Sequence, residues 1–184
     1  MILGGLDVGR HHDRTALVVL DTGVVTEAHL VPSLPLAEQA DILEPLIRPL
    51  DLCLVDMTGL GLGLYELLWG RELPVVGVVI GSWHQARVRR RDMGRLPSKV
   101  YVGKMALIGA AVAAINNKQI TVAPWCCHRV ELRGELEALA LNRTPRGNIR
   151  VGAHKGHDDL AIALGLAIVA RDLSSGLLPE VAAA

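Results

Sequence analysis

The chain has 184 residues, the usual size of one domain, and 51% of them are hydrophobic, which is enough for a buried core. No apolar run is long enough to cross a membrane and no signal-type segment opens the sequence, so we predict a soluble, intracellular protein. The three cysteines are odd in number and none lies in a CxxC pair, which argues against a disulfide scaffold and against a zinc site. We expect one α/β domain over residues 1–175 and a flexible tail over residues 176–184.

The formal net charge of zero conceals a strong segregation of charge along the chain. Residues 1–80 carry 4 basic and 11 acidic side chains, residues 81–155 carry 14 and 4, and residues 156–184 carry 1 and 4. This pattern is typical of a protein whose acids bind cations while its bases meet phosphates. The alternative is that solvated faces differ in charge by chance.

Three antiparallel strands are predicted to open the fold. Residues 2–8 and 15–20 are apolar runs on either side of a polar GRHHDR turn, which predicts a β-hairpin. Val24–Val31 continues as a third strand, since Gly23 supplies a turn and β-branched residues dominate its first half.

A strand–helix–strand unit is predicted after a first helix, which the apolar spacing places over residues 36–50. Residues 52–55 form a buried strand that stops at Asp56, a turn leads into a helix through about Trp69, and residues 75–80 form the next strand. Such units are right-handed, so these two strands should be parallel.

The second half of the chain is predicted to contain short strands and three helices. The elements are a basic loop or hairpin over residues 82–103, helices over 104–116 and 129–141, a short strand over 119–122 between them, and a largely buried helix over 158–173. Residues 148–151 form a last strand, or one arm of a hairpin whose turn lies near residues 142–145.

Four aspartates lie where an apolar element ends or begins. Asp7 lies in the first strand, Asp56 ends a buried strand, and Asp158 and Asp159 open the last helix. A buried carboxylate without a partner is costly, and hard divalent cations such as Mg²⁺ or Mn²⁺ prefer oxygen ligands. We therefore predict that these acids hold two divalent cations, a pair that can hydrolyse a phosphodiester.

Each candidate also has a purely structural interpretation, which is weakest for Asp7. Asp158 could be the N-cap of the last helix with Asp159 as a first-turn acid, and Asp56 could cap the helix that follows it. Asp13, across the first turn, could reach the same site directly or through water, or could be a turn residue. His157 could order a metal-bound water or contact a phosphate, although a histidine beside a helix start is more often a local hydrogen-bonding group.

Three stretches place these acids in recognisable motifs: GGLDVGRHHDRTALVVL (4–20), LCLVDMTGLG (52–61) and GHDDLAIALGLA (156–167). In this order and at these spacings they resemble the C-terminal nuclease domain of tailed-bacteriophage large terminases, in the ribonuclease H-like superfamily. Residues 104–124, a helix running into ITVAP, also look like the family's connection between its second and third motifs. The resemblance covers nearly the whole chain.

The resemblance implies a ribonuclease H-like α/β fold, with a mixed sheet of three antiparallel strands followed by parallel strands, flanked by helices. In it Asp7, Asp56 and either Asp158 or Asp159 match the family's metal ligands. The glycine-rich turn that begins with Thr58 and Gly59 permits a tight bend beside the metals. The basic residues 84–104 match the place of an auxiliary hairpin near the DNA path.

The resemblance also implies an endonuclease that cuts double-stranded viral DNA into genome lengths during packaging, with weak sequence specificity. Its expected partners are DNA, an ATPase motor domain, the portal and the small terminase, in the cytoplasm of an infected bacterium. The sequence contains no GxxxxGKS or GxxxxGKT motif, so we expect an isolated domain or a stand-alone relative and assign it no motor activity.

The predicted DNA contacts go to phosphates, so affinity should fall steeply with salt. The residues predicted to make them are Arg87, Arg89, Arg90, Arg91, Arg95, Lys99 and Lys104, with Lys155 near the acids.

Three other functions fit parts of the sequence. A Holliday-junction-resolvase-like nuclease would use the same acids on the same fold and cut branched junctions. An actin-like ATP-binding domain is suggested by the turns after Asp7 and Asp56, although such proteins need two lobes and more than 184 residues. A non-catalytic DNA-binding module would keep the fold without needing the acids.

Overall fold

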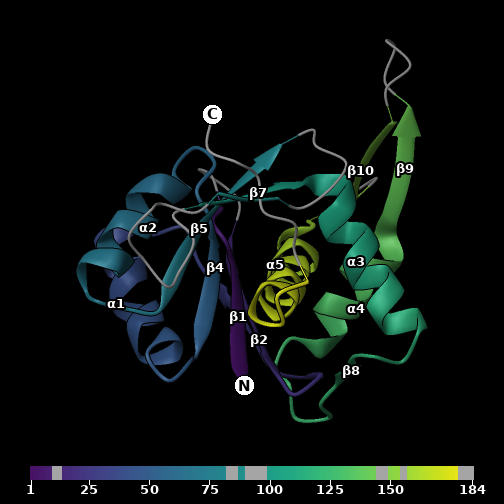
Figure 1. The fold of residues 1–184 in the computed structure, drawn as a ribbon, viewed down its shortest axis with the longest axis horizontal. Coiled ribbons are helices and arrows are strands. Elements are labelled where there is room, and N and C mark those ends of the chain that lie inside the picture. The colour runs from purple at the N-terminus through teal and green to yellow at the C-terminus, as the bar shows by residue number, and fades with distance from the viewer. Residues whose placement is uncertain (10–13, 82–86, 90–98, 144–148, 154–156, 178–184) are drawn as a thin grey trace.

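The computed structural model describes residues 1–9, 14–81, 87–89, 99–143, 149–153 and 157–177. Within them, eight strands form one sheet in the order β6-β7-β5-β4-β1-β2-β3-β8, and β9 and β10 form a separate hairpin (Figure 1). The strands are β1 (Ile2–Asp7), β2 (Thr15–Asp21), β3 (Val24–Val31), β4 (Leu52–Asp56), β5 (Val75–Gly81), β6 (Arg87–Arg89), β7 (Lys99–Gly103), β8 (Thr121–Val122), β9 (Leu139–Arg143) and β10 (Ile149–Ala153). The helices are α1 (Leu36–Ile47), α2 (Gly61–Gly70), α3 (Lys104–Asn116), α4 (Arg129–Ala138) and α5 (Asp159–Ser174).

The large sheet is mixed, which confirms the predicted fold class. β1, β2 and β3 are antiparallel neighbours, whereas β1, β4, β5 and β7 are parallel to one another in turn. β4 and β5 flank α2 and are parallel, as the strand–helix–strand pattern predicts. The parallel strands therefore all end at the same edge of the sheet.

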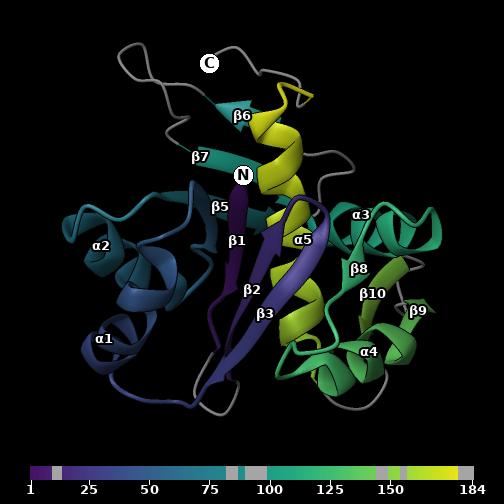
Figure 2. The same ribbon diagram turned by 90° about the horizontal axis from the view of Figure 1, so that it is seen from below.

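Helices cover both faces of the sheet, with α1 and α2 on one face and α3, α4 and α5 on the other (Figures 1 and 2). The pleat of β2 shows how one strand serves both faces, because successive side chains point in opposite directions. Leu17 and Val19 pack in the core beneath α1 and α2, whereas Val18 and Leu20 pack in the core around α5.

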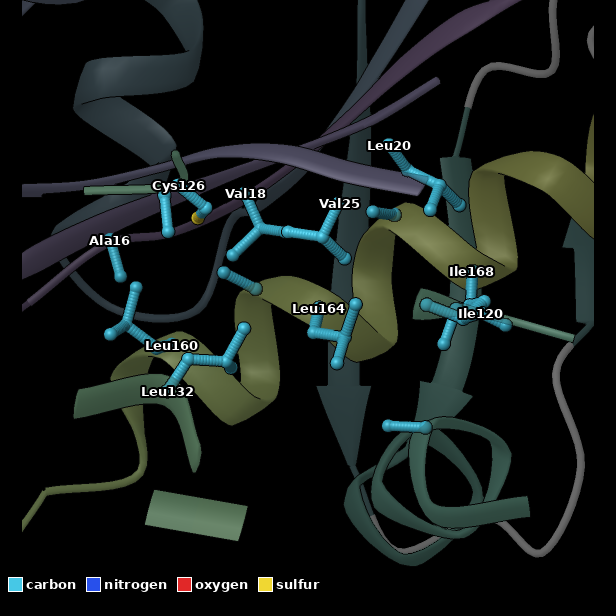
Figure 3. Packing of buried hydrophobic residues seen from close by; sticks show 14 of the residues in the cluster. Ala16, Val18, Leu20, Val25, Ile120, Cys126, Leu132, Leu160, Leu164 and Ile168 are labelled. Carbon is cyan, nitrogen blue, oxygen red and sulfur yellow. The ribbon is translucent and has the colours of Figure 1, made fainter. Parts of the chain in front are cut away.

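The helix α5 is the central element of its face. Every residue from Asp159 to Ala170 is buried, and Leu160 and Leu164 pack against side chains of β2 and β3 (Figure 3). The helix lies close to β1 because Gly5 has no side chain: a Cβ there would lie 2.0 Å from the carbonyl oxygen of Ala163. Among the described residues, neither this helix nor any other is long and apolar enough to cross a membrane.

The basic segment contains a strand that the sequence places only in a loop or hairpin. β6 and β7 do form an antiparallel hairpin, but β7 also pairs in parallel with β5 and so belongs to the large sheet. Its alternate residues Val100 and Val102 are fully buried, which gives the strand an apolar inner face. Residues 82–86 and 90–98 lie outside the described residues.

Three further predictions were wrong in their bounds. The helix predicted over residues 36–50 ends at Ile47. The helix predicted over residues 129–141 ends at Ala138, because Leu139 is extended and starts β9, which pairs with β10. This pairing confirms that residues 149–151 belong to one arm of a hairpin, but Asn142 and Arg143, predicted near its turn, lie in strand β9. The strand predicted over residues 119–122 begins only at Thr121, because the backbone N–H groups of Gln119 and Ile120 donate to the Ala114 carbonyl at the end of α3.

Candidate metal centre

The candidate site lies where two neighbouring parallel strands end. β1 ends at Asp7 and β4 at Asp56, each one residue beyond the last register pair, Leu6 with Val55. Leu6 and Val55 belong to the core under α1 and α2, so the alternation of the pleat turns both aspartates toward the opposite face, where α5 lies.

The start of α5 brings the second pair of acids to the same edge. Since Gly5 of β1 lies against Ala163, the residues that begin the helix lie near the end of β1. Asp158 directly precedes α5 and Asp159 is its first residue. Asp159 and Asp56 are only 7% and 8% exposed, so both are buried carboxylates.

The electrostatic state of Asp7 shows that the four acids act on one another. Burial is the largest cause that raises its pKa well above the usual value, and the negative charges of Asp56, Asp159 and Asp158 raise it further. The ammonium of Lys104 lowers the pKa but does not cancel the other effects. Ionisation of Asp7 is therefore unfavourable in this environment, and a cation bound beside its carboxylate would favour the ionised form.

The turn after β4 fixes the orientation of Asp56. Its Oδ1 accepts two hydrogen bonds from Thr58, one from the backbone N–H at 2.9 Å and one from the hydroxyl at 2.6 Å. Gly59 adopts a left-handed conformation with φ of 65°, and a Cβ at Gly61 would lie 1.9 Å from the Asp56 carbonyl oxygen. Leu60, not Asp56, occupies the N-cap of α2, so the capping interpretation of Asp56 is wrong.

Asp158 stands at the N-cap position of α5 but makes no side-chain capping hydrogen bond. Its Oδ2 instead accepts a hydrogen bond of 2.6 Å from the ammonium of Lys104, the first residue of α3. The interpretation of Asp158 as an ordinary N-cap is therefore wrong. Because α3 follows β7 directly, Lys104 enters the site from the same edge of the sheet as the acids.

The donor set fits a hard divalent cation. Asp7, Asp56, Asp158 and Asp159 offer carboxylate oxygens, and the Lys104 ammonium on Asp158 shows that the site accepts a cation. His157 Nδ1 lies 3.5 Å from Oδ2 of Asp159 and borders the cluster. In the described part of the chain, no three His, Cys, Asp or Glu side chains converge on one metal position as they stand.

Comparisons with known proteins place this geometry in context. No protein-family model matches the sequence, and no curated protein matches it. The large terminase nuclease of thermophilic phage G20c with bound magnesium is 21% identical and matches with a TM-score of 0.73, over 92% of this chain and 80% of that chain. The large terminase nuclease domain of Thermus phage P74-26 is 20% identical, with a TM-score of 0.65 over 91% and 77%. The large terminase nuclease domain of bacterial virus Sf6 is 12% identical, with a TM-score of 0.63 over 91% and 87%.

The chain has the fold of the large terminase nucleases. The match spans nearly all of it, and the sheet has the ribonuclease H-like arrangement of three antiparallel strands followed by parallel ones. Identities of 12–21% make this a likeness of fold. Structures of the phage G20c nuclease also exist with bound cobalt, and of the Sf6 domain with manganese.

Within this terminase nuclease fold, the predicted DNA-contacting residues are only partly described. Lys99 is exposed at the start of β7, and Lys104 binds Asp158. Arg87 and Arg89 lie on β6, of which the backbone is described. The remaining predicted residues, Asp13 of the metal set and Arg90, Arg91, Arg95 and Lys155 of the DNA set, lie outside the described residues.

Sequence reasoning missed one carboxylate of this site region, Glu135 on α4. It is 7% exposed, and its Oε2 accepts hydrogen bonds from the backbone N–H groups of Leu160 and Ala161 at 2.8 and 3.1 Å. A signal was present in the sequence, because Glu135 lies three residues after Leu132 and one before Leu136. It therefore falls on the apolar stripe of an otherwise charged helix.

Proposed function

We propose that this chain is a metal-dependent endonuclease that cleaves double-stranded viral DNA during genome packaging, as the nuclease domain of a terminase large subunit. The observation that carries the proposal is the gathering of Asp7, Asp56, Asp158 and Asp159 at one sheet edge of a terminase nuclease fold. These four carboxylates, with Lys104 bound to Asp158, are proposed to form a site for cations and, through those cations, for a phosphodiester.

Two Mg²⁺ or Mn²⁺ ions are the proposed cofactors, with the four aspartates as their ligands. Bound there, such a pair supplies an activated water and stabilises the leaving oxygen of a phosphodiester. The magnesium and manganese in the phage G20c and Sf6 structures support this choice. Asp7 and Asp56 end strands of the sheet and so present their oxygens from a rigid base, and Thr58 holds Asp56 in place.

The protein's own cations are proposed to hold the DNA. Lys104 gives up its hydrogen bond when Asp158 turns to a metal, and its ammonium then becomes available to a phosphate at the same edge. The basic residues that precede it in the sequence, from Arg87 to Lys99, are proposed to contact further phosphates. Because phosphates carry no base identity, the nuclease should cleave with weak sequence specificity. In the full assembly we propose an ATPase motor domain, the portal and the small terminase as its partners.

Cleavage of plasmid DNA tests this proposal. Supercoiled plasmid, linear duplex and a synthetic four-way junction are incubated with the protein in Mg²⁺, Mn²⁺ or EDTA. We expect nicking and linearisation of plasmid and cutting of linear duplex with either metal, and no cutting in EDTA. Cutting of the junction alone would contradict a packaging nuclease and favour a resolvase.

The variants for this assay replace one carboxylate oxygen each. Asp7→Asn and Asp158→Asn should lower the cleavage rate at least about a hundredfold, because each removes a metal ligand on which the reaction depends. Asp172→Asn is the matched control on α5, since Asp172 pairs with Arg171 far from the acids. Cleavage by Asp7→Asn at the native rate would refute the proposed site.

A further inference from the structure

The first turn of α5 is capped from outside the helix. The first N–H groups of a helix have no partner within it, and the residue at the N-cap usually supplies one through its side chain. Asp158 holds that position and makes no such bond, whereas Oε2 of Glu135 accepts from Leu160 and Ala161, the second and third residues of the helix. Glu135 thus performs the capping that Asp158 does not.

This division of roles has a consequence for the acids. A carboxylate that caps its own helix folds back over the first turn, so its oxygens are committed to backbone N–H groups. With Glu135 in that role, the Asp158 carboxylate turns instead to Lys104, at 2.6 Å. The helix start is also buried, so its N–H groups need an acceptor, and a charged one binds them strongly.

Packing of α4 and a nearby guanidinium also bear on the position of Glu135. It lies on the buried face of α4 with Leu132, which is fully buried in the core around α5. Its Oε1 lies 3.7 Å from a guanidinium nitrogen of Arg14, the residue before β2. The Glu135 side chain therefore links α4 and Arg14, which precedes β2, to the start of α5.

We propose that Glu135 is a positioning residue of the metal centre. It fixes the first turn of α5 so that Asp158 and Asp159 present their carboxylates to cations rather than to the helix backbone. This inference rests on the proposed function, since it assumes that Asp158 or Asp159 binds metal. Loss of Glu135 would let Asp158 rotate into the vacant capping position and withdraw an oxygen from the site.

Three substitutions of Glu135 separate positioning from charge and from folding. Glu135→Gln keeps an oxygen that can accept both N–H bonds but removes the charge. Glu135→Asp keeps the charge but shortens the side chain by one methylene, and Glu135→Ala removes the acceptor. Glu137→Gln is the matched control two residues along α4, because Glu137 is exposed and pairs only with Arg133 among the described residues.

The readout is Mn²⁺ binding, followed by electron paramagnetic resonance well below the unfolding temperature of each variant. We expect Glu135→Ala and Glu135→Asp to raise the Mn²⁺ dissociation constant about tenfold, as loss of residues that orient metal ligands typically does. Glu135→Gln should stay within about threefold of the native chain, and Glu137→Gln should not change it. Duplex affinity in Ca²⁺ should stay unchanged while kcat falls with the metal affinity.

The Mn²⁺ affinities of these variants support or overturn the proposed role of Glu135. Native Mn²⁺ affinity in Glu135→Ala would overturn the inference, and an equal loss in Glu135→Gln and Glu135→Ala would show that charge, not capping, matters. If Glu135→Ala fails to fold, the other two variants decide the question. Tighter Mn²⁺ binding by Glu135→Gln than by Glu135→Asp would support the inference, and tighter binding by Glu135→Asp would overturn it. Absence of Mn²⁺ binding and cleavage in the native chain would instead refute the proposed function.

Discussion

Among single residues, Asp7 shows most clearly how the candidate site lowers the stability of the folded protein. Burial and three neighbouring carboxylates raise its pKa, and the ammonium of Lys104 offsets them only in part. Without a bound cation, the ionised form of Asp7 therefore destabilises the native state. Such strain is common at functional sites, where residues are placed for binding rather than for stability.

This argument predicts that Asp7→Asn stabilises the metal-free protein at neutral pH. A raised pKa means that the native state binds the proton more tightly than the unfolded chain, so this stabilisation is complete below the usual value of 3.8 and is lost as pH rises through the native pKa. Asparagine does not ionise. In EDTA at pH 7 we therefore expect the Asp7→Asn variant to melt at a higher temperature than the native chain, by about 2–4 °C for each kcal/mol of stability gained. Thermal melts from pH 3 to 8 measure this, and a lower melting temperature for Asp7→Asn at pH 7 would contradict the account.

The four acids could be predicted from the sequence because each stands at the end or start of an apolar run, and the ends of parallel strands meet at one edge. Two contacts could not be predicted. The capping by Glu135 joins residues 25 and 26 positions apart, and the bond between Lys104 and Asp158 joins residues 54 apart. Both depend on how the helices pack, which local pattern does not determine.

Among the elements, the packing of α5 on β1 positions the site. The helix can lie this close only because Gly5 has no side chain, since a Cβ would lie 2.0 Å from the Ala163 carbonyl oxygen and 2.4 Å from the backbone nitrogen of Ala167. Backbone atoms cannot move aside as a flexible side chain can. The distance between α5 and β1 in turn sets where Asp158 and Asp159 lie relative to Asp7.

We predict that Gly5→Ala destabilises the fold by about 1–3 kcal/mol, the usual cost of inserting a methyl group into a packed core. Gly109→Ala on α3 is the control, because nothing lies within 4 Å of a Cβ there. It should stabilise the fold by up to about 1 kcal/mol, since alanine favours helix more than glycine does. Urea unfolding measures both, and equal stability of Gly5→Ala and the native chain would contradict this packing.

Most elements could be predicted from hydrophobic periodicity, which was strong in β1 to β5 and in α5. The predictions failed where a pairing partner decides the structure. Residues 139–141 continue an amphipathic helical pattern, but pairing of β9 with β10 extends them. Val100 and Val102 alternate as strand residues should, yet the surrounding arginines and lysines concealed that β7 joins the large sheet.

In the whole molecule, the four acids of the candidate site and the described part of the basic segment belong to different elements of the large sheet and its helices. The four acids lie at the carboxyl ends of β1 and β4 and at the start of α5. The basic strands β6 and β7 form one border of the large sheet, with β5 between them and β4 (Figure 2). β7 leads directly into Lys104, whose ammonium binds Asp158, so this lysine links the hairpin to the acids. A duplex bound along the hairpin would therefore reach the proposed metals.

This arrangement predicts that Arg89→Ala combined with Arg91→Ala weakens duplex binding without changing Mn²⁺ affinity. Each lost phosphate contact should reduce the steepness of log affinity against log salt concentration by about 1. The double variant should therefore have a slope that is shallower by about 2. Fluorescence anisotropy with labelled duplex in Ca²⁺ at several salt concentrations measures the slope. Arg133→Ala on α4 is the control, and an unchanged slope in the double variant would remove the hairpin from the DNA-binding surface.

The central claim, that the four aspartates form a metal centre, is tested most directly by anomalous diffraction from crystals soaked in MnCl₂. We predict two manganese peaks at the carboxyl edge of the sheet, ligated by Asp7, Asp56 and at least one of Asp158 and Asp159, with Lys104 displaced from Asp158. Crystals of Asp7→Asn should lose at least one peak. Fully soaked native crystals with no manganese at these carboxylates would contradict the account.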